Sequence, residues 1–324
     1  MGNLPGISAA FISEIVRREV SSIQWVEELP GLWASVARQW GLEMTGPLRT
    51  GATSLVIPVV TRTGLRAAVK LVSPVVTIDA EVSALRAFAG RGAVTLLEAE
   101  DARQAMLLEW IDGPALSEMT DMGAAAAIAG RLTRELALAV PPTGAPRLAD
   151  QAGPWAAQLR GQHDAARRNG TAMSDEHLES ALGIIRHLAS DNTSTLTHGD
   201  LSLSNILRAE GDRWVAIDPV LLVGTPANEA HTVVRSHLTA AIRSEDRGAR
   251  LTDWTRRFSE AAGADFALAR ALSFARFVAS YYWESQNGGE AIDVARLRKA
   301  ALLLAPTLTG PREELIDILC SPTA

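Results

Sequence analysis

Hydrophobic residues recur at helical spacing through the first 40 residues of the chain. The pattern predicts helix over residues 10–40, and its apolar positions are Phe11, Ile15, Leu29, Leu32, Val36 and Trp40. The step Leu29-Pro30-Gly31 contains two poor helix formers. We therefore expect a break there, with a second helix starting after it.

The pattern changes to that of strands after about residue 46. Residues 54–60 and 66–72 are apolar runs rich in β-branched side chains, with a turn at Thr63-Gly64 between them. Two such runs around a short turn predict a β-hairpin. The next predicted elements are a helix at 79–89 and a second pair of strands at 94–99 and 104–110.

The sequence Asp112-Gly113-Pro114 interrupts this regular pattern. Beyond it the chain is mainly helical, with one short β interruption at residues 206–217. We expect an α+β protein with a two-lobed layout, in which residues 1–109 form a small β-rich lobe and residues 110–324 a larger helical one. A cleft between two such lobes is a common place for a ligand.

The composition excludes several classes of protein. Of the 324 residues 47% are hydrophobic and 21% charged, which is typical of a folded chain and not of a disordered or membrane protein. The net charge of −6 argues against a nucleic-acid binder, which needs a basic face. The single cysteine, Cys320, excludes an intramolecular disulfide and a cysteine-built zinc site.

The first residues do not match a targeting signal. They carry charges and no continuous apolar core, so a signal peptide is not expected, and Gly6 breaks the myristoylation pattern. We expect a cytoplasmic protein that has neither nucleic acid nor membrane as a partner and exists as a monomer or weak homodimer.

The motif with the clearest chemistry is His198-Gly199-Asp200 followed by Asn205. Asp218 comes thirteen positions after Asn205, past a strand-like segment. Alone, each of these residues is as typical of a turn or a helix cap. Together they match the Asp-x₄-Asn loop and metal-binding Asp of phosphoryl-transfer enzymes. Asp200 can deprotonate a hydroxyl, and the other two offer hard oxygen ligands to Mg²⁺.

A lysine in a chain that otherwise uses arginine is the second candidate. Lys70 and Lys299 are the only lysines, and Lys70 ends the sequence Ala-Ala-Val-Lys on the second predicted strand. This resembles the strand whose lysine holds nucleotide phosphates. Glu81 lies at the edge of the apolar stripe of the next helix, where a carboxylate needs a partner. We expect Lys70 and Glu81 to pair.

Weaker candidates complete the predicted site. The hydroxyls of Thr53 and Ser54 are placed to cover phosphates, although an ordinary turn fits the same residues, and the linker Glu109-Trp110-Ile111 offers backbone groups to adenine. We expect His198 to orient the loop and not to transfer a proton. Trp283 and Glu284 are candidates for substrate contact, although core positions have the same pattern.

The combination of these motifs resembles the aminoglycoside phosphotransferase family, and within it the branch of streptomycin 6-kinases and hydroxyurea-resistance kinases. The resemblance covers roughly residues 25–305, and the segments that carry it are LRTGATSLVIPV, GLRAAVKL, GRGAVTLLE, AMLLEWIDG, HGDLSLSN and WVAIDPVLLVGTP.

The resemblance implies a protein-kinase-like fold, ATP and Mg²⁺. By motif position it implies that Asp200 is the catalytic base and that Asn205 and Asp218 bind the metal. Lys70 is then the residue that binds the α- and β-phosphates, with Glu81 as its partner. The acceptor of this branch is a hydroxyl of the streptidine ring of streptomycin, so an aminoglycoside is the first acceptor to expect.

Two departures from the family pattern leave the acceptor open. Ser202 stands where many relatives have histidine, and the sequence from Thr225 to Glu229 replaces an Asp-Pro-x-Phe-Asp loop. Glu229 is the acidic residue there that suits a guanidinium-bearing acceptor. The alternatives are a kinase for another hydroxylated metabolite or antibiotic, hydroxyurea included, or a nucleotide-binding protein without catalysis.

Overall fold

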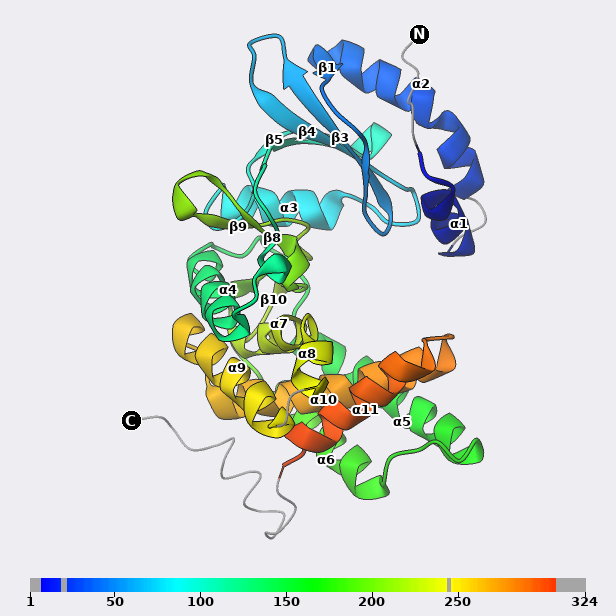
Figure 1. The fold of residues 1–324 in the computed structure, drawn as a ribbon, viewed down its shortest axis with the longest axis vertical. Coiled ribbons are helices and arrows are strands. Elements are labelled where there is room, and N and C mark those ends of the chain that lie inside the picture. The colour runs from blue at the N-terminus through cyan, green and yellow to red at the C-terminus, as the bar shows by residue number, and fades with distance from the viewer. Residues whose placement is uncertain (1–6, 19–21, 244–245, 307–324) are drawn as a thin grey trace. The chain divides into compact units, whose positions relative to one another are not determined.

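The computed structural model describes residues 7–18, 22–243 and 246–306. The chain divides into two compact units, Met1–Asp112 and Gly113–Ala324. The first unit is a β-sheet with helices and the second is mainly helical (Figure 1). The fold class is therefore α+β, as the sequence predicts.

The first unit is built on an antiparallel sheet with the strand order β1-β3-β4-β6-β5. Strand β2 pairs with Leu55 and Val56, near the start of β3. The strands are β1 (Leu42–Met44), β2 (Arg49–Thr50), β3 (Ser54–Thr61), β4 (Arg66–Val72), β5 (Leu96–Glu100) and β6 (Ala105–Glu109). Both predicted hairpins, β3–β4 and β5–β6, are confirmed. The helices are α1 (Ala9–Arg18), α2 (Ser22–Trp40) and α3 (Asp79–Phe88).

The two faces of the sheet have different partners because successive side chains of a strand point to opposite faces. Val69 and Leu71 of β4 belong to one core with Phe11 of α1 and with Trp25 and Trp33 of α2. Helices α1 and α2 lie along one side of the sheet (Figure 1). The residue between Val69 and Leu71 is Lys70, whose side chain contacts α3 on the opposite face.

The predicted helix break at Pro30 is wrong. Helix α2 runs without interruption from Ser22 to Trp40 with Pro30 inside it. Proline removes one helical hydrogen bond, but Leu29, Trp33 and Val36 on either side of it are all buried in the core. Burial of these large side chains along one face of α2 outweighs the lost hydrogen bond.

The second unit contains most of the helices. They are α4 (Met122–Leu136), α5 (Ala152–Arg168), α6 (Asp175–Leu188), α7 (Ala230–Arg235), α8 (Leu238–Arg243), α9 (Arg247–Ala262), α10 (Phe266–Gln286) and α11 (Ala291–Leu304). Several begin at a residue whose side chain accepts a hydrogen bond from the first turn, as helix caps do: Asp121, Ser174 and Asp265. No described helix is both long and apolar enough to cross a membrane.

Short strands in the second unit position the loops that carry the predicted site residues. Strands β8 (Ile206–Arg208) and β9 (Trp214–Ala216) form the predicted β interruption. A second pair, β7 (Leu196–Thr197) with β10 (Leu222–Val223), was not predicted, because two-residue strands leave no periodic pattern. These two pairs frame the segments that carry Asp200 and Asp218.

Candidate active site

Asp200 lies in the loop between β7 and β8, and its side chain is exposed. The backbone carbonyl of Asp200 accepts hydrogen bonds from Nδ2 of Asn205 at 3.0 Å and from the backbone N–H of Ser202 at 2.8 Å. The loop is therefore folded back on itself. The amide group of Asn205 is used in this contact, which leaves its Oδ1 as the atom that a cation would meet.

His198 joins this loop to the segment that carries Asp218. Its Nε2 donates to the carbonyl of Ile217 at 2.9 Å, and its Nδ1 accepts from the backbone N–H of Asp200 at 3.3 Å. The ring is 1% exposed. One side chain thus bonds both to the backbone of Asp200 and to the residue before Asp218, and its proton is fixed on Nε2.

Asp218 and Gly199 both adopt left-handed backbone conformations, with φ of +58° and +82°. Glycine adopts this conformation at no steric cost, whereas aspartate does so less readily. A Cβ at position 199 would lie 2.8 Å from the carbonyl oxygen of Val220. The motif therefore needs glycine between His198 and Asp200 to let the two segments approach.

Glu229 has a different place from the one that the sequence predicts. Its carboxylate is 1% exposed, and it accepts the backbone N–H groups of Gly199 at 2.6 Å and Leu201 at 3.2 Å. The side chain lies beneath the Asp200 loop and not on a surface that an acceptor reaches. A residue expected to contact substrate instead fixes the two amides on either side of Asp200.

In the first unit Lys70 and Glu81 form the predicted ion pair. Lys70 Nζ donates to both carboxylate oxygens of Glu81 at 2.7 Å, and the two side chains are 8% and 15% exposed. A buried lysine of this kind needs a carboxylate partner. The β4 pattern places Lys70 on the α3 face, and Glu81 comes from the first turn of α3.

The turn between β2 and β3 carries Thr53 and Ser54. The backbone N–H of Gly51 donates to the carbonyl of Ser54 at 2.9 Å, and the carbonyl of Thr53 accepts from Ser73. Ser54 is 4% exposed, so its hydroxyl faces the turn, whereas Thr53 is half-buried. Of the two predicted hydroxyls, that of Thr53 is the one with access to solvent.

The end of β6 carries Glu109, Trp110 and Ile111. The backbone N–H of Glu109 donates to the carbonyl of Thr95, and its carboxylate accepts from the Thr95 hydroxyl at 2.9 Å. Glu109 is therefore engaged inside the sheet, and its N–H is not one that adenine would meet. Ile111 is buried, at 7% exposure.

Trp110 lies among charged residues at the end of the unit. The guanidinium groups of Arg49 and Arg66 lie 4.8 and 5.6 Å from the centre of its ring, distances at which a cation is attracted to the ring face. Arg66 also donates to Asp112 at 3.0 Å, and this hydrogen bond lowers the pKa of the Asp112 carboxyl.

The second unit contains two neighbouring pockets, and Asp200 lines one of them. One of them, of about 350 Å³, is lined by Asp200 and by hydroxyl side chains: Ser117, Ser202, Ser204, Thr232 and Ser236. We call it the hydroxyl pocket. Arg235 lines this pocket too, and it also lines the second one, which therefore adjoins the first.

The second pocket, of about 300 Å³, lies between α5 and α10, and we call it the tryptophan pocket. It contains both predicted contact residues, Trp283 and Glu284, together with Trp155 and Arg276. Trp283 is 50% exposed, which is unusual for so large an apolar side chain. Glu284 accepts from Arg235 at 3.0 Å.

Sequence reasoning missed Trp155, Arg235 and Arg276. A signal for the first was present, because Gln151, Trp155, Gln158 and Gln162 recur at the spacing of one helix face. Arg276 interrupts an otherwise apolar run in α10. A charged side chain in such a run is rarely buried unless it has a polar partner. Nothing in the sequence around Arg235 distinguishes it from the other arginines.

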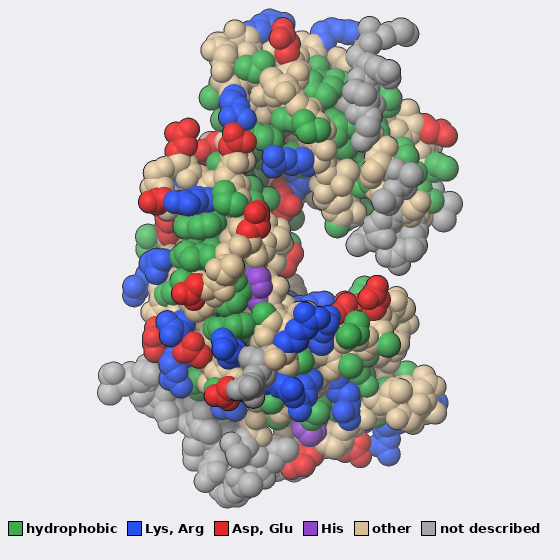
Figure 2. All heavy atoms as spheres, in the orientation of Figure 1, with side chains coloured by type: hydrophobic (Ala, Val, Ile, Leu, Met, Phe, Trp, Pro, Cys, Tyr) green, Lys and Arg blue, Asp and Glu red, His purple; other side chains and the backbone are tan. Residues whose placement is uncertain are grey.

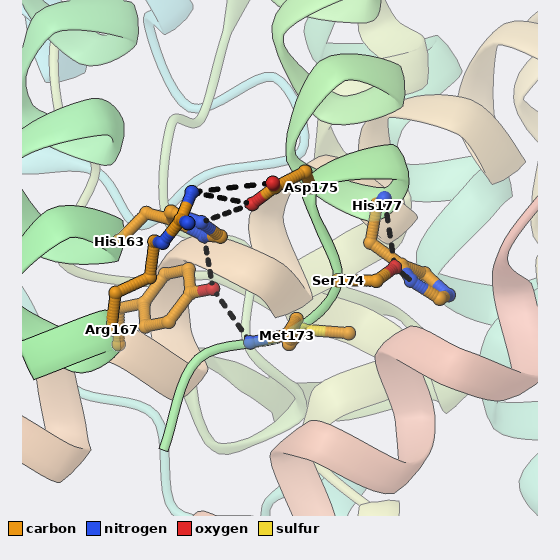
Figure 3. A network of polar contacts seen from close by, with 7 residues as sticks. His163, Arg167, Met173, Ser174, Asp175 and His177 are labelled. Atoms are coloured by element: carbon orange, nitrogen blue, oxygen red, sulfur yellow. Dashed lines mark hydrogen bonds and ion pairs between the residues drawn. The ribbon is translucent and has the colours of Figure 1, made fainter. Parts of the chain in front are cut away.

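A polar network behind the tryptophan pocket connects its two walls. The hydroxyl of Tyr282 on α10 contacts His163 Nδ1 on α5 at 2.8 Å and accepts from the backbone N–H of Met173 at 3.0 Å. His163 also contacts Asp175, to which Arg167 donates as well (Figure 3). Burial raises the pKa of the Tyr282 hydroxyl, which therefore stays protonated.

A family model described as "Aminoglycoside/hydroxyurea antibiotic resistance kinase" matches residues 39–288 of the chain. The chain belongs to this family. It is therefore a phosphotransferase, as the motifs around Asp200 and Lys70 indicate. Kinases of this type take their phosphoryl group from ATP and generally use a divalent metal ion.

Two relatives align with this kinase over most of their own length. It is 35% identical over 285 residues to a hydroxyurea phosphotransferase of Kitasatospora aureofaciens, which covers 87% of this chain and 80% of the relative. It is 31% identical over 291 residues to a streptomycin 6-kinase of Streptomyces griseus, which covers 87% of this chain and 91% of the relative.

The solved structures show the same fold at lower sequence identity. A choline/ethanolamine kinase family protein from Mesorhizobium loti superposes with a TM-score of 0.56 at 16% identity, covering 89% of this chain and 98% of that one. At this identity the likeness concerns the fold alone. The kinase-like fold expected from the sequence is confirmed.

Proposed function

We propose that this kinase transfers the γ-phosphoryl group of ATP to a hydroxyl of a small-molecule antibiotic or related metabolite, with Asp200 as the catalytic base. The observation that carries the proposal is the position of Asp200. Its backbone is held by Asn205 and His198, while its side chain lines a pocket rich in hydroxyl groups. The acceptor oxygen attacks the γ-phosphorus, the bond to ADP breaks, and the acceptor proton passes to Asp200.

The residues present fit a Mg²⁺ ion as the metal. The described residues contain no cluster of three or more His, Cys, Asp or Glu side chains able to hold a metal. Mg²⁺ needs no such cluster, because it binds through one or two protein oxygens together with water and phosphate oxygens. We assign those oxygens to Asn205 Oδ1 and the Asp218 carboxylate. When bound, the ion neutralises charge that develops on the phosphates.

We assign ATP binding in the first unit to Lys70, positioned by Glu81, on the α- and β-phosphates. The backbone of the β2–β3 turn and the hydroxyl of Thr53 are proposed to cover the phosphates, with Ser54 shaping the turn from inside. The backbone of Trp110 and Ile111 is the proposed contact for adenine. Since ATP is supplied inside the cell, the proposed reaction is a cytoplasmic one.

The curated relatives suggest two acceptors, an aminoglycoside such as streptomycin and hydroxyurea. Trp283 and Glu284 of the tryptophan pocket are the proposed acceptor contacts, since they adjoin the hydroxyl pocket through Arg235. We do not assign Glu229 to the acceptor site. We propose instead that Glu229 and His198 position the Asp200 loop.

The proposal is tested with a panel of hydroxylated antibiotics and metabolites that includes streptomycin and hydroxyurea. Each is incubated with the protein, ATP and Mg²⁺, and ADP release and the mass of the product are measured. A product heavier by one phosphate, absent with Asp200→Asn, supports the proposal. ATP binding without turnover on the whole panel would support the non-catalytic alternative instead.

A further inference from the structure

The tryptophan pocket is lined by two aromatic rings and a row of carboxamides. Trp155 is on α5 and Trp283 is on α10. Gln158 and Gln162 also line the pocket from α5, three and seven positions after Trp155. Residues at this spacing lie on one face of a helix. The ring of Trp155 and the two carboxamides therefore lie along one strip of the pocket wall.

The solvent-facing surface of the two tryptophans indicates a binding site. Trp283 is 50% exposed and Trp155 is half-buried. On the face of this unit that Figure 2 shows, hydrophobic side chains are interspersed with charged ones. Scattered hydrophobic residues of that kind need no explanation, whereas two large aromatic side chains in one concave place are typical of a ligand pocket.

Contacts behind the pocket hold its two walls together. The hydroxyl of Tyr282 on α10 contacts Nδ1 of His163 on α5 at 2.8 Å, and the two rings meet edge to face with their centres 5.8 Å apart. Further along α10, Nε2 of Gln286 donates to the carbonyl of Gln162 at 2.8 Å. The helices that carry the tryptophans are thus fixed before a ligand arrives, which lowers the entropy cost of binding.

These groups match the chemistry of a sugar ring. The flat sides of such a ring expose C–H groups, which pack on the face of an aromatic side chain. The hydroxyls at the ring edge both donate and accept hydrogen bonds, and so does a carboxamide. A purely aromatic ligand would use Trp155 and Trp283 but would leave the carboxamides of Gln158 and Gln162 without a role.

The charged groups near the pocket are compatible with the cationic groups that an aminoglycoside presents. Glu284 accepts from Arg235 at 3.0 Å in the pocket wall. Burial lowers the pKa of the Arg276 guanidinium, whereas the charges of Glu229 and Asp200 raise it. Among these groups the carboxylates outnumber the guanidinium groups, so a guanidinium or ammonium group of an acceptor is attracted overall.

Size separates the two acceptors that the relatives suggest. The tryptophan pocket measures about 300 Å³ and the hydroxyl pocket about 350 Å³, each near the lower end of the roughly 300–1,000 Å³ of small-molecule sites. Arg235 lines both pockets, so a molecule of two linked parts can occupy them together. Streptomycin, in which a disaccharide is attached to the streptidine ring, has two such parts. Hydroxyurea is small enough for the hydroxyl pocket alone.

We propose that the tryptophan pocket is a saccharide subsite, in which Trp155 and Trp283 bind the faces of a sugar ring. Gln158 and Gln162 bind the hydroxyls of that ring, while another part of the same molecule presents its hydroxyl to Asp200. Trp155 is then a specificity-determining residue, which favours glycoside acceptors over small ones. The inference rests on the proposed function, because it takes the hydroxyl pocket as the place of phosphoryl transfer.

The test compares streptomycin with free streptidine, which has the same guanidinium-bearing ring but no disaccharide. Binding is measured by saturation-transfer NMR titration, in which ligand protons close to the protein gain saturation from it. We expect the disaccharide protons of streptomycin to gain the most saturation, and streptidine to bind at least about tenfold more weakly, a loss of about 1.4 kcal/mol. Hydroxyurea is titrated as the small acceptor, and transfer to all three is followed by ADP release with ATP and Mg²⁺.

Variants assign the effect to Trp155. Trp155→Ala should raise the Kd and the KM for streptomycin at least about tenfold, and it should leave kcat and KM for hydroxyurea near those of the wild type. Trp155→Phe keeps a ring face and should recover most of the binding. Trp283→Ala, at a half-exposed position, tests the same subsite if Trp155→Ala does not fold. Arg160→Ala, exposed on α5 and outside the pocket lining, is the matched control.

The outcomes separate this inference from the proposed function. If the disaccharide signals are found and are lost in Trp155→Ala, but no ADP is released with any acceptor, the saccharide subsite stands and the phosphotransfer proposal fails. If streptomycin binds no more tightly than streptidine, the inference is overturned, and transfer to any acceptor would still support the phosphotransfer proposal. The inference is also overturned if Trp155→Ala changes the kinetics for hydroxyurea as much as those for streptomycin, because that result indicates a structural role.

Discussion

The Glu229 carboxylate and the Gly199 backbone N–H form a 2.6 Å hydrogen bond across 30 positions of sequence. The second carboxylate oxygen accepts from Leu201, so the two amides that flank Asp200 share one buried anion. A carboxylate can accept both bonds, because it has no donor of its own. The orientation of the proposed catalytic base therefore depends on a buried side chain from a distant part of the sequence.

Glu229→Gln should lower kcat by about tenfold or more while the KM for ATP stays near that of the wild type. A carboxamide turns one N–H₂ group toward a backbone donor, which leaves a buried N–H unsatisfied at a cost of about 1–3 kcal/mol. Steady-state kinetics with varied ATP distinguish the two parameters. Glu260→Gln on the exposed face of α9 is the control, and an unchanged kcat in Glu229→Gln would contradict the positioning role.

Asp200→Asn should reduce phosphoryl transfer by about 10²–10⁴-fold, because a carboxamide cannot accept the acceptor proton. ATP binding should change little, since the side chain lines the hydroxyl pocket. Turnover and the Kd for ATP are measured on the same preparation. Asp212→Asn, at the exposed tip of the β8–β9 hairpin, serves as the matched control; wild-type turnover in Asp200→Asn would remove Asp200 from the mechanism.

Lys70→Arg should raise the KM for ATP, lower kcat, or both, by about tenfold overall. The site holds a compact ammonium 2.7 Å from both oxygens of Glu81, and a planar guanidinium is too wide for the same position. The chain supplies its own control, because Lys299, its other lysine, is exposed on α11. Normal kinetics in Lys70→Arg, matching those of Lys299→Arg, would exclude Lys70 from nucleotide binding.

Tyr282→Phe should destabilise the second unit by about 1–3 kcal/mol, because it leaves the buried groups of His163 and Met173 without a partner. Tyr281→Phe is the comparison. Its hydroxyl donates to the carbonyl of Thr171, an exposed residue that water can satisfy, so we expect a smaller effect. Thermal and urea unfolding of the two variants should differ in this order, and equal losses would argue against the network.

His231 predicts a loss of stability on acidification. Burial lowers the pKa of its ring well below the ordinary value of 6.5, and the charges of Arg276 and Arg235 lower it further. The unfolded chain then binds a proton that the folded chain does not, so the contribution is complete above about pH 6.5 and decreases as the pH falls below it.

The measurement compares unfolding free energies at pH 7.5 and 5.5, values on either side of the ordinary histidine pKa of about 6.5. His231→Phe, which can keep the edge contact of the ring with Phe277, should lose part of the difference between the two pH values. His187→Gln, near the end of α6, should keep all of it. A wild-type protein equally stable at both pH values would contradict the prediction.

Much of the site could be predicted because its chemistry is local in sequence. Asp200 and Asn205 are five positions apart, and the strand pattern alone turns Lys70 toward the helix that carries Glu81. The sequence could not show that Glu229 lies beneath the loop, since an acidic residue before a helix is equally typical of a surface. Nor could it show that Trp155 and Trp283 face one pocket, because helix packing brings them together.

The error at Pro30 has the same origin. Helix propensity is a property of a few neighbouring residues, whereas the helix persists because Leu29 and Trp33 are buried against the sheet. Local rules therefore located the motifs and most elements well, and failed where packing in the core overrides a local preference.

The segment after Asp218 leads directly back to β7, the strand from which the Asp200 loop begins. Val220 donates to the carbonyl of His198 at 2.7 Å, and Val223 pairs with Leu196 in the β7–β10 ladder. Phosphorylation activates some kinases by ordering a loop. The segment after Asp218 is already ordered by its backbone hydrogen bonds, so it does not need that step. We therefore expect such an enzyme to be active as soon as it is folded, so that a cell meeting a toxic compound would set its rate of defence by how much of the protein it makes.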